Sequence, residues 1–133
     1  HRGFSLKQCL IEQIKTVQWT DVGCSNANRC DYPLYAQKVA QLVQQRIVDG
    51  GVLMCGTGIG MSIAANRFKK IYAALAWNQE IARKAKEDDN ANILILPSDI
   101  VSCQEAQMMI ETWLAASFKQ DHYTRRIAII DAY

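Results

Sequence analysis

The sequence predicts an α/β protein, in which a parallel sheet carries helices on both faces. Apolar residues at helical spacing alternate along the chain with short apolar runs, which is typical of strands joined by crossover helices. The clearest short run, residues 52–54, is bounded by glycines and leads into a glycine-rich turn. A strand followed by such a turn and then by a helix is the repeating unit of this fold class.

Helices and strands can be assigned on both sides of this turn. Before it, two amphipathic helices are expected, with apolar faces at Leu6, Leu10, Ile14 and Val17 and at Tyr35, Val39, Leu42 and Val43. Residues 19–22, between these helices, are a strand candidate. After the turn, strands are expected at 72–76 and 93–96, and helices over 78–87 and 103–118.

The order of these elements favours a three-layer, Rossmann-like sheet in one domain that spans residues 1–133. The chain has 133 residues, of which 50% are hydrophobic and only two are prolines, so it can bury one core and shows no linker. The helix over 103–118 has an apolar stripe that is most simply part of that core: Ala106, Met109, Ile110, Trp113 and Leu114.

The composition argues against nucleic acid and membrane partners. The formal net charge is +2, and the 15 basic residues are spread among 13 acidic ones without a basic run. No apolar stretch approaches the roughly 20 residues of a membrane span, and no signal peptide is visible, so the cytoplasm is the expected location. The glycines of residues 56–60 alternate as Gly-x-Gly-x-Gly, which matches neither common phosphate-loop motif, so nucleotide binding is not expected.

The cysteines are predicted to be reduced thiols. A chain with this much core does not need a disulfide scaffold, and the cysteine count is odd. There is no Cys-x-x-Cys pair, and the two histidines, His1 and His122, lie at opposite ends of the chain. We therefore expect no metal and no other cofactor. The five cysteines are Cys9, Cys24, Cys30, Cys55 and Cys103.

Cys55 is the candidate reactive group, because it lies where a strand ends and the glycine loop begins. Ligands of open α/β sheets bind at that edge. Glycines let the backbone approach a ligand closely, and a helix that starts within residues 62–66 would direct N–H groups toward it, so an anionic ligand is expected. The positive end of that helix would favour a thiolate acting as base or nucleophile. The alternative is a cysteine that only fills space.

Residues 51–66, Gly-Val-Leu-Met-Cys-Gly-Thr-Gly-Ile-Gly-Met-Ser-Ile-Ala-Ala-Asn, resemble the active-site segment of the type B ribose-5-phosphate isomerases. That family includes allose-6-phosphate and galactose-6-phosphate isomerases. Further segments resemble it in the same order: His1-Arg2-Gly3-Phe4 with Leu6-Lys7, Asp31-Tyr32-Pro33 with Tyr35-Ala36, and Asn90-Ala91-Asn92-Ile93-Leu94. The resemblance covers essentially the whole chain.

The resemblance implies an aldose–ketose isomerase of the pentose phosphate pathway, which interconverts ribose 5-phosphate and ribulose 5-phosphate through a cis-enediol. It implies that Cys55 moves the proton between C2 and C1. Thr57 and the loop amides would stabilise charge on the substrate oxygens, the alternative for Thr57 being an ordinary turn hydroxyl. The other loop residues expected to contact substrate are Gly56, Gly58, Ile59, Gly60 and Ser62.

The resemblance also implies ligands outside the loop. Arg126 matches a phosphate-binding arginine, and Arg125 lies beside it; an arginine fork makes paired bonds to phosphate oxygens. His1 matches a histidine that contacts phosphate or sugar. The residues expected at the sugar are Asp31, Tyr32 and Asn66. For the tyrosine the alternative is a packing role, and for the asparagine it is backbone capping.

Several positions depart from the family pattern. Asp88 stands where the family has a ring-opening histidine, and Asp89 replaces the asparagine after it. An aspartate is a poor acid at pH 7 unless burial beside a like charge raises its pKa. Asp99 and His122 stand where phosphate-binding arginines are common, which should weaken phosphate binding. The family's first strand, which ends in an aspartate, is expected before His1 and is missing from the sequence as given.

Three functional hypotheses stay open at this point. The chain is an isomerase of ribose 5-phosphate, an isomerase of a six-carbon sugar phosphate, or a catalytically weak binding subunit of the same fold. Leu34 and Asp88 depart from the pentose pattern and favour the second. The resemblance implies a homodimer or a dimer of dimers, and residues 125–130 agree, because they place a basic pair beside apolar residues that a monomer would expose.

Overall fold

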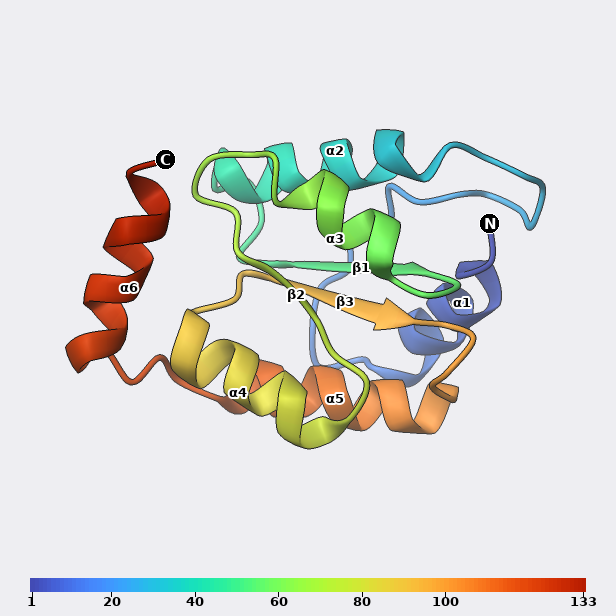
Figure 1. Cartoon of the computed structure of the whole chain (residues 1–133). Coiled ribbons are helices and arrows are strands. Elements are labelled where there is room, and N and C mark those ends of the chain that lie inside the picture. The colour runs from blue at the N-terminus through green and yellow to red at the C-terminus, as the bar shows by residue number, and fades with distance from the viewer.

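A computed structural model describes residues 1–133. Its strands form one parallel sheet in the order β1-β3-β2 (Figure 1), and their bounds are β1 (Gly51–Cys55), β2 (Ala73–Leu75) and β3 (Ile93–Pro97). The central strand β3 pairs with both neighbours, so that Cys55 lies opposite Pro97. The predicted α/β fold with a parallel sheet is confirmed.

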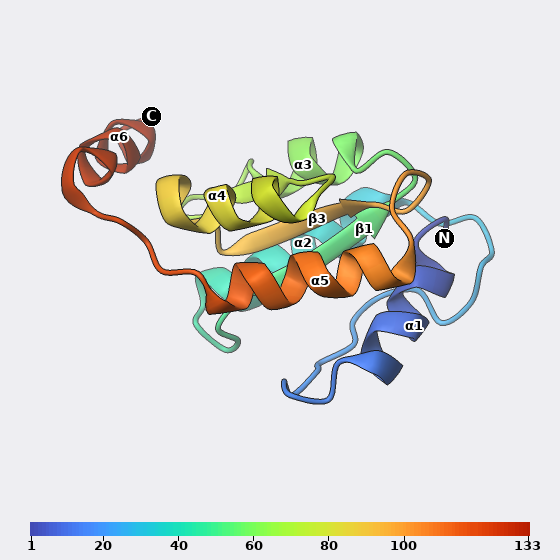
Figure 2. The ribbon, with the colours of Figure 1, turned by 90° about the horizontal axis from the view of Figure 1, so that it is seen from below.

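Helices cover both faces of this sheet. They are α1 (Phe4–Gln13), α2 (Tyr32–Gln44), α3 (Ile59–Ala65), α4 (Gln79–Asp89), α5 (Cys103–Ala115) and α6 (Asp121–Asp131). In Figure 1, α2 and α3 lie on one face, and α4 and α5 lie on the other. Figure 2 shows α1 beside α5, whereas α6 stands apart from the layers at the end farthest from the N-terminus. None of the helices has the length and apolar character needed to cross a membrane.

Each face of the sheet packs on its own hydrophobic core, because successive side chains of a strand point to opposite faces. Leu94 and Leu96 pack with buried residues of α1, α4 and α5. Ile93 and Ile95 pack with buried residues of α2 and α3. All four side chains are fully buried, as expected of a central strand that is covered on both sides.

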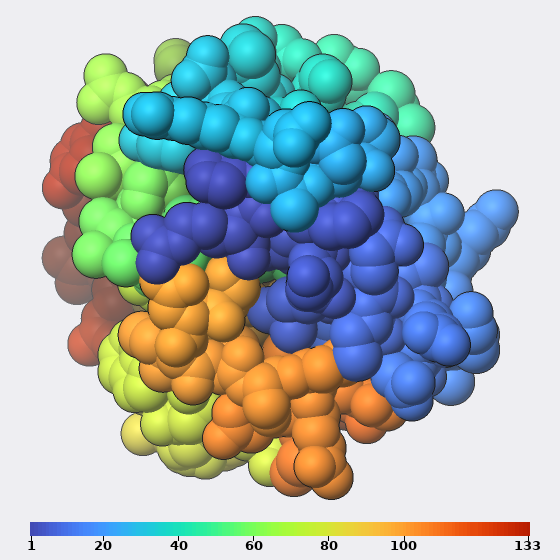
Figure 3. Space-filling model, turned by 90° about the vertical axis from the view of Figure 1, so that its right-hand side faces the viewer, coloured from blue at the N-terminus to red at the C-terminus, as the bar shows by residue number.

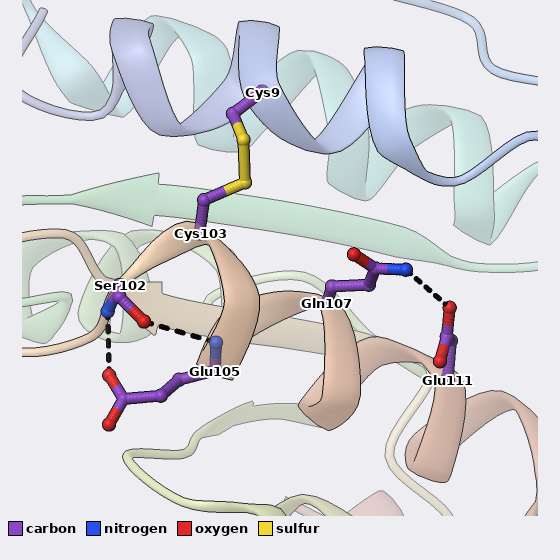
Figure 4. The surroundings of a disulfide bond; sticks show 6 residues. All are labelled: Cys9, Ser102, Cys103, Glu105, Gln107 and Glu111. Carbon is purple, nitrogen blue, oxygen red and sulfur yellow. Dashed lines mark hydrogen bonds between the residues drawn. A yellow bond between two sulfur atoms is a disulfide. The ribbon is translucent and has the colours of Figure 1, made fainter.

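Polar residues fix the ends of the helices that follow β2 and β3. Asn78 Oδ1 accepts a hydrogen bond from the Ile81 amide at 2.9 Å at the start of α4, and Asn90 ends this helix in a left-handed conformation with φ 50°. Ser102 Oγ accepts from the Glu105 amide at 3.1 Å, and the Ser102 amide donates to the Glu105 carboxylate at 2.7 Å (Figure 4). This capping box starts α5 at the predicted residue.

The strand predicted at residues 19–22 was wrong, because this segment is irregular. The Trp19 indole donates to the Ile14 carbonyl at 2.9 Å, and the Asp21 carboxylate accepts from Lys7 Nζ at 2.9 Å. These two bonds hold residues 19–22 against α1 and against Ile14, the residue that follows this helix. The Trp19 side chain therefore packs on the core, although its segment does not join the sheet.

The C-terminal region also differs from the prediction. The helix expected over 103–118 ends at Ala115, because Ala116 is extended with ψ 151°. Helix α6 was not predicted. It is held by Asp131, which accepts hydrogen bonds from the Tyr72 hydroxyl at 2.8 Å and from Lys70 Nζ at 2.6 Å.

The prediction that all cysteines are reduced was wrong for one pair. Cys9 of α1 and Cys103 at the start of α5 form a disulfide, with Cα atoms 6.3 Å apart (Figure 4). The two residues are 94 positions apart in the chain, so no local pattern indicates their pairing. Cys24, Cys30 and Cys55 are free thiols.

Candidate active site

A cavity of about 560 Å³ runs beside β1 to its carboxyl end. Figure 3 shows this side of the molecule, with the first residues, in dark blue, between the start of α2, in cyan, and the segment near residue 100, in orange. The carboxyl edge of a parallel sheet is where ligands of such folds bind. The predicted site residues that line the cavity are His1, Tyr32, Cys55, Gly56, Thr57, Ile59 and Gly60.

Cys55 is the last residue of β1, and its side chain is half-buried at the cavity wall. Its sulfur accepts a hydrogen bond from the Gly58 amide at 3.2 Å. Gly58 adopts φ 78°, a left-handed conformation that glycine reaches without steric cost. The loop therefore turns back on the cysteine and places a donor at its sulfur.

The rest of the loop supplies amides and one hydroxyl. Thr57 is exposed, and its Oγ1 accepts from the Ile59 amide at 3.3 Å, which is the turn contact named above as the alternative for this residue. The Ser62 amide donates to the Gly58 carbonyl at 3.0 Å. The amides of Gly60 and Met61, in the first turn of α3, make no hydrogen bond within the protein.

The loop that follows β3 supports the Cys55 segment. The Ser98 amide donates to the Cys55 carbonyl at 2.9 Å, and the Asp99 amide donates to the Gly56 carbonyl at 3.0 Å. Ser98 Oγ also donates to the Arg2 carbonyl at 3.1 Å, and Arg2 forms an ion pair with Asp99. The sequence did not indicate Arg2 as a site residue, and it indicated Asp99 only as a lost positive charge.

The N-terminal residue and the start of α2 form the opposite wall. The ring of Tyr32 packs on Gly60. Asp31 holds the N-cap position of α2 but makes no side-chain capping bond, is exposed and does not line the cavity. His1 is exposed, and its Nδ1 accepts from the Cys30 amide at 3.4 Å. Of these predicted sugar contacts, the structure therefore brings Tyr32 and His1 to Cys55.

Asn66 lies at the far end of α3 and does not line the cavity. Its Nδ2 donates to the Ser62 carbonyl at 3.0 Å and to the Ala73 carbonyl at 2.8 Å. Its Oδ1 accepts from the Ala73 amide at 2.9 Å. The side chain thus caps the backbone and joins α3 to β2, which was the alternative role given for this residue.

Two more thiols line the cavity, and the sequence did not predict either of them at this site. Cys24 and Cys30 lie with their sulfur atoms 2.8 Å apart in the irregular segment before α2. No three side chains of His, Cys, Asp or Glu gather in an arrangement that could hold a metal ion.

The remaining predicted site residues lie at the other end of the sheet. Asp88 and Asp89 end α4, shortly before β3 begins, and Arg125 and Arg126 belong to α6. Figure 1 shows α6 and the end of α4 beside the starts of the strands, opposite the loop after β1. The five residues of β1 alone span about 13 Å. One chain therefore does not bring these side chains to its own Cys55.

The pKa values of the two aspartates at this end of the sheet shift in opposite directions. A hydrogen bond from Lys119 Nζ at 2.7 Å holds the pKa of Asp88 below its ordinary value. Partial burial and the charge of Asp88 raise the pKa of Asp89. Asp88 is therefore an ionised carboxylate at neutral pH, able to accept a proton but poorly suited to donate one.

Comparison with known proteins gives a consistent result over the whole chain. Residues 1–130 match the sequence profile of the family described as Ribose/Galactose Isomerase. Ribose-5-phosphate isomerase B of Escherichia coli (strain K12) is 36% identical over 134 residues, which cover 99% of this chain and 90% of that protein.

Solved structures agree with this match. A ribose 5-phosphate isomerase from Thermotoga maritima has a TM-score of 0.98 at 39% identity, with 100% of this chain and 93% of that chain covered. Ribose-5-phosphate isomerase B from Mycoplasma genitalium, solved with bound ribulose-5-phosphate, has a TM-score of 0.94 at 37% identity, with 100% and 90% covered.

Proposed function

The chain belongs to the ribose/galactose isomerase family, and on this basis we propose that it interconverts ribose 5-phosphate and ribulose 5-phosphate through a cis-enediol intermediate. The observation that carries the proposal is the position of Cys55, a thiol at the carboxyl end of β1 whose sulfur faces a glycine loop at a cavity wall. Aldose–ketose isomerisation needs one group that removes a proton from C2 and returns it to C1.

Cys55 is that group in this proposal. As a thiolate it takes the C2 proton of the open-chain aldose, which leaves a cis-enediolate with its charge on O1. The proton of the O2 hydroxyl passes to O1, and the Cys55 thiol then returns its proton to C1 to form the ketose. No net oxidation occurs, because C2 loses the hydrogen that C1 gains. The Gly58 amide at 3.2 Å orients the sulfur for both transfers.

Charge that develops on the sugar oxygens needs donors aimed at the cavity. The amides of Gly60 and Met61 have no protein partner and begin α3, whose N-terminal end is positive. The Thr57 hydroxyl is exposed in the same loop and can donate its hydrogen while it accepts from the Ile59 amide. These three groups are the proposed stabilisers of the enediolate.

The relatives favour a five-carbon substrate, because they are ribose-5-phosphate isomerases and one was solved with bound ribulose-5-phosphate. Leu34, one of the two residues that suggested a hexose phosphate, is 57% exposed and does not line the cavity. Asp88, the other, lies at the opposite end of the sheet and could reach a cavity only from a second copy. The pentose phosphate is therefore the substrate we propose.

We further propose a homodimer in which the distal group of one chain completes the cavity of the other. The distal group comprises Asp88, Asp89, Arg125 and Arg126. Helix α6 buries none of its residues, and Ile129 and Ile130 on it are 50% and 49% exposed, which suits a surface covered by a second copy. The cytoplasm is the proposed location, as expected of an enzyme that acts on phosphorylated metabolites.

The test is an isomerisation assay of the purified protein on ribose 5-phosphate and allose 6-phosphate, together with exchange of the C2 proton with solvent. The wild type should turn over the pentose phosphate, and Cys55→Ala should abolish proton exchange. Cys24→Ala, which removes another thiol of the same cavity, is the matched control and should keep exchange. Unchanged exchange in Cys55→Ala would reject the assignment of the base.

A further inference from the structure

The cavity beside Cys55 holds few positive charges. Among the side chains that line it, only those of Arg2 and Lys7 carry a full positive charge at neutral pH. The ammonium group of Lys7 is already hydrogen-bonded within the protein. It donates to both oxygens of Asp21 at 2.9 Å and to the Cys24 carbonyl at 2.5 Å. Within one chain, Arg2 is therefore the cationic side chain of this cavity that remains available to a ligand, whereas Arg125 and Arg126 would come from a second copy.

The guanidinium of Arg2 lies directly against the glycine loop. A Cβ atom built on Gly56 would fall 2.6 Å from both Nε and Nη1 of Arg2, so only glycine leaves room for the arginine. Gly56 is the residue that follows Cys55. The planar group of Arg2 thus contacts the residue next to Cys55 in the chain, and the Arg2 side chain is 56% exposed to solvent.

Two contacts hold Arg2 in this position. Its Nη2 pairs with Asp99, whose own amide donates to the Gly56 carbonyl at 3.0 Å. Its backbone carbonyl accepts from Ser98 Oγ at 3.1 Å. The ion pair uses one side of the guanidinium, whereas no protein acceptor bonds to Nε or Nη1. A guanidinium with a free side of this kind suits paired bonds to two oxygens of one phosphate.

We propose that Arg2 binds the phosphate group of the sugar phosphate at the mouth of the Cys55 cavity. The proposal rests on the proposed function for the identity of the substrate. The phosphate takes no part in the proton transfer, so it can bind at the solvent-facing mouth, where the Arg2 side chain lines the cavity and is exposed. The enediolate charge, by contrast, develops deeper at the loop amides of Gly60 and Met61.

Binding of inorganic phosphate, measured by calorimetry without any turnover, tests this role separately from the isomerase activity. Arg2→Gln should weaken phosphate binding about tenfold or more, because a hydrogen bond to a charged group is lost. Arg2→Lys keeps the charge but loses the fork, so its affinity should lie between those of Arg2→Gln and the wild type. Arg67→Gln removes an exposed arginine that does not line the cavity, and it should bind phosphate like the wild type.

Kinetics on ribose 5-phosphate give the second readout. In Arg2→Gln, KM should rise by a factor similar to that of the phosphate dissociation constant, while kcat stays within about twofold. A loss confined to kcat with unchanged phosphate affinity would overturn the proposal and assign Arg2 to the enediolate. Equal phosphate affinity in Arg2→Gln and the wild type would also overturn it. A wild type that binds phosphate through Arg2 but does not isomerise ribose 5-phosphate would contradict the proposed function alone.

Discussion

The backbone amide of Gly58 donates a hydrogen bond to the sulfur of Cys55 across a distance of 3.2 Å. The two residues are three positions apart, and the bond forms because Gly58 adopts φ 78° and turns the chain back on the strand end. The proposed base is thus oriented by the backbone of its own loop and by no neighbouring side chain. This makes the conformation of position 58 part of the site.

Gly58→Ala should therefore impair both stability and proton transfer. An L-residue in the left-handed region costs about 1–2 kcal/mol, and the new Cβ would overlap Leu75. We expect the free energy of unfolding to fall by at least this amount and exchange of the C2 proton to slow in the folded fraction. Denaturant unfolding and solvent deuterium exchange measure the two effects. Gly23→Ala, at a glycine that lines the same cavity but has no positive φ, is the control and should leave exchange intact, because it does not change the turn at Cys55.

The bond between Tyr72 and Asp131 should make the attachment of α6 sensitive to alkali. Burial and the hydrogen bond to Asp131 raise the pKa of Tyr72 from 10.0 to about 12. A group with a raised pKa stabilises the fold fully below its unfolded pKa, and this contribution is lost as pH rises through the folded value. We expect the free energy of unfolding to fall between about pH 10 and 12 with a steeper slope in the wild type than in Tyr72→Phe. Equal slopes in urea titrations across this range would contradict the assignment.

Local sequence patterns predicted the strands and helices that are determined by neighbouring residues in the chain. The apolar run of β3 and the glycines around β1 gave these strands nearly to the residue, because buried parallel strands are apolar on both faces. Residues 19–22, which begin with Trp19 and end with Val22, form no strand, since hydrogen bonds to Ile14 and Lys7 hold them elsewhere. The disulfide of Cys9 joins residues 94 positions apart, which no periodicity can reveal.

The same difference between local and long-range contacts separates the site residues that were predicted from those that were not. The position of Cys55 and the glycine loop at a strand end was predicted from sequence, because a strand end and its turn are contiguous in the chain. Arg2 was missed because its place beside Gly56 depends on Asp99, which lies on a loop far along the chain. Asn66 looked like a ligand, yet its amide is used by the backbone of Ser62 and Ala73. Which of two roles a polar side chain takes is decided by long-range packing.

The proposed dimer can be tested by complementation between two inactive chains. One chain carries Cys55→Ala, and the other carries Arg125→Ala with Arg126→Ala. If each cavity uses the arginines of the partner, a mixed dimer contains one intact site. Mixing equal amounts after brief dissociation should then restore about a quarter of the wild-type sites, because half of the dimers are mixed. Activity no higher than the sum of the separate variants would contradict shared sites.

Asp88 is poorly suited to ring opening, the role that the proposed chemistry would require at its position. Opening the sugar ring requires a group that passes a proton between the anomeric hydroxyl and the ring oxygen. Histidine does this well near pH 7, because its unperturbed pKa is about 6.5. The Lys119 ammonium instead holds the pKa of Asp88 below its ordinary value, so this carboxylate is a poor acid. We therefore expect the enzyme to depend on the small open-chain fraction of its substrate.

Asp88→His should raise turnover on cyclic ribose 5-phosphate and leave turnover on the open-chain form unchanged. The comparison requires matched open-chain concentrations, since only then does it separate ring opening from proton transfer at Cys55. Glu12→His, which places a histidine on an exposed face of α1, is the control and should bring no gain. Suppose instead that the wild type already consumes the cyclic sugar far faster than spontaneous ring opening permits, and that Asp88→His adds nothing. Another residue then opens the ring, and the role proposed for position 88 is wrong.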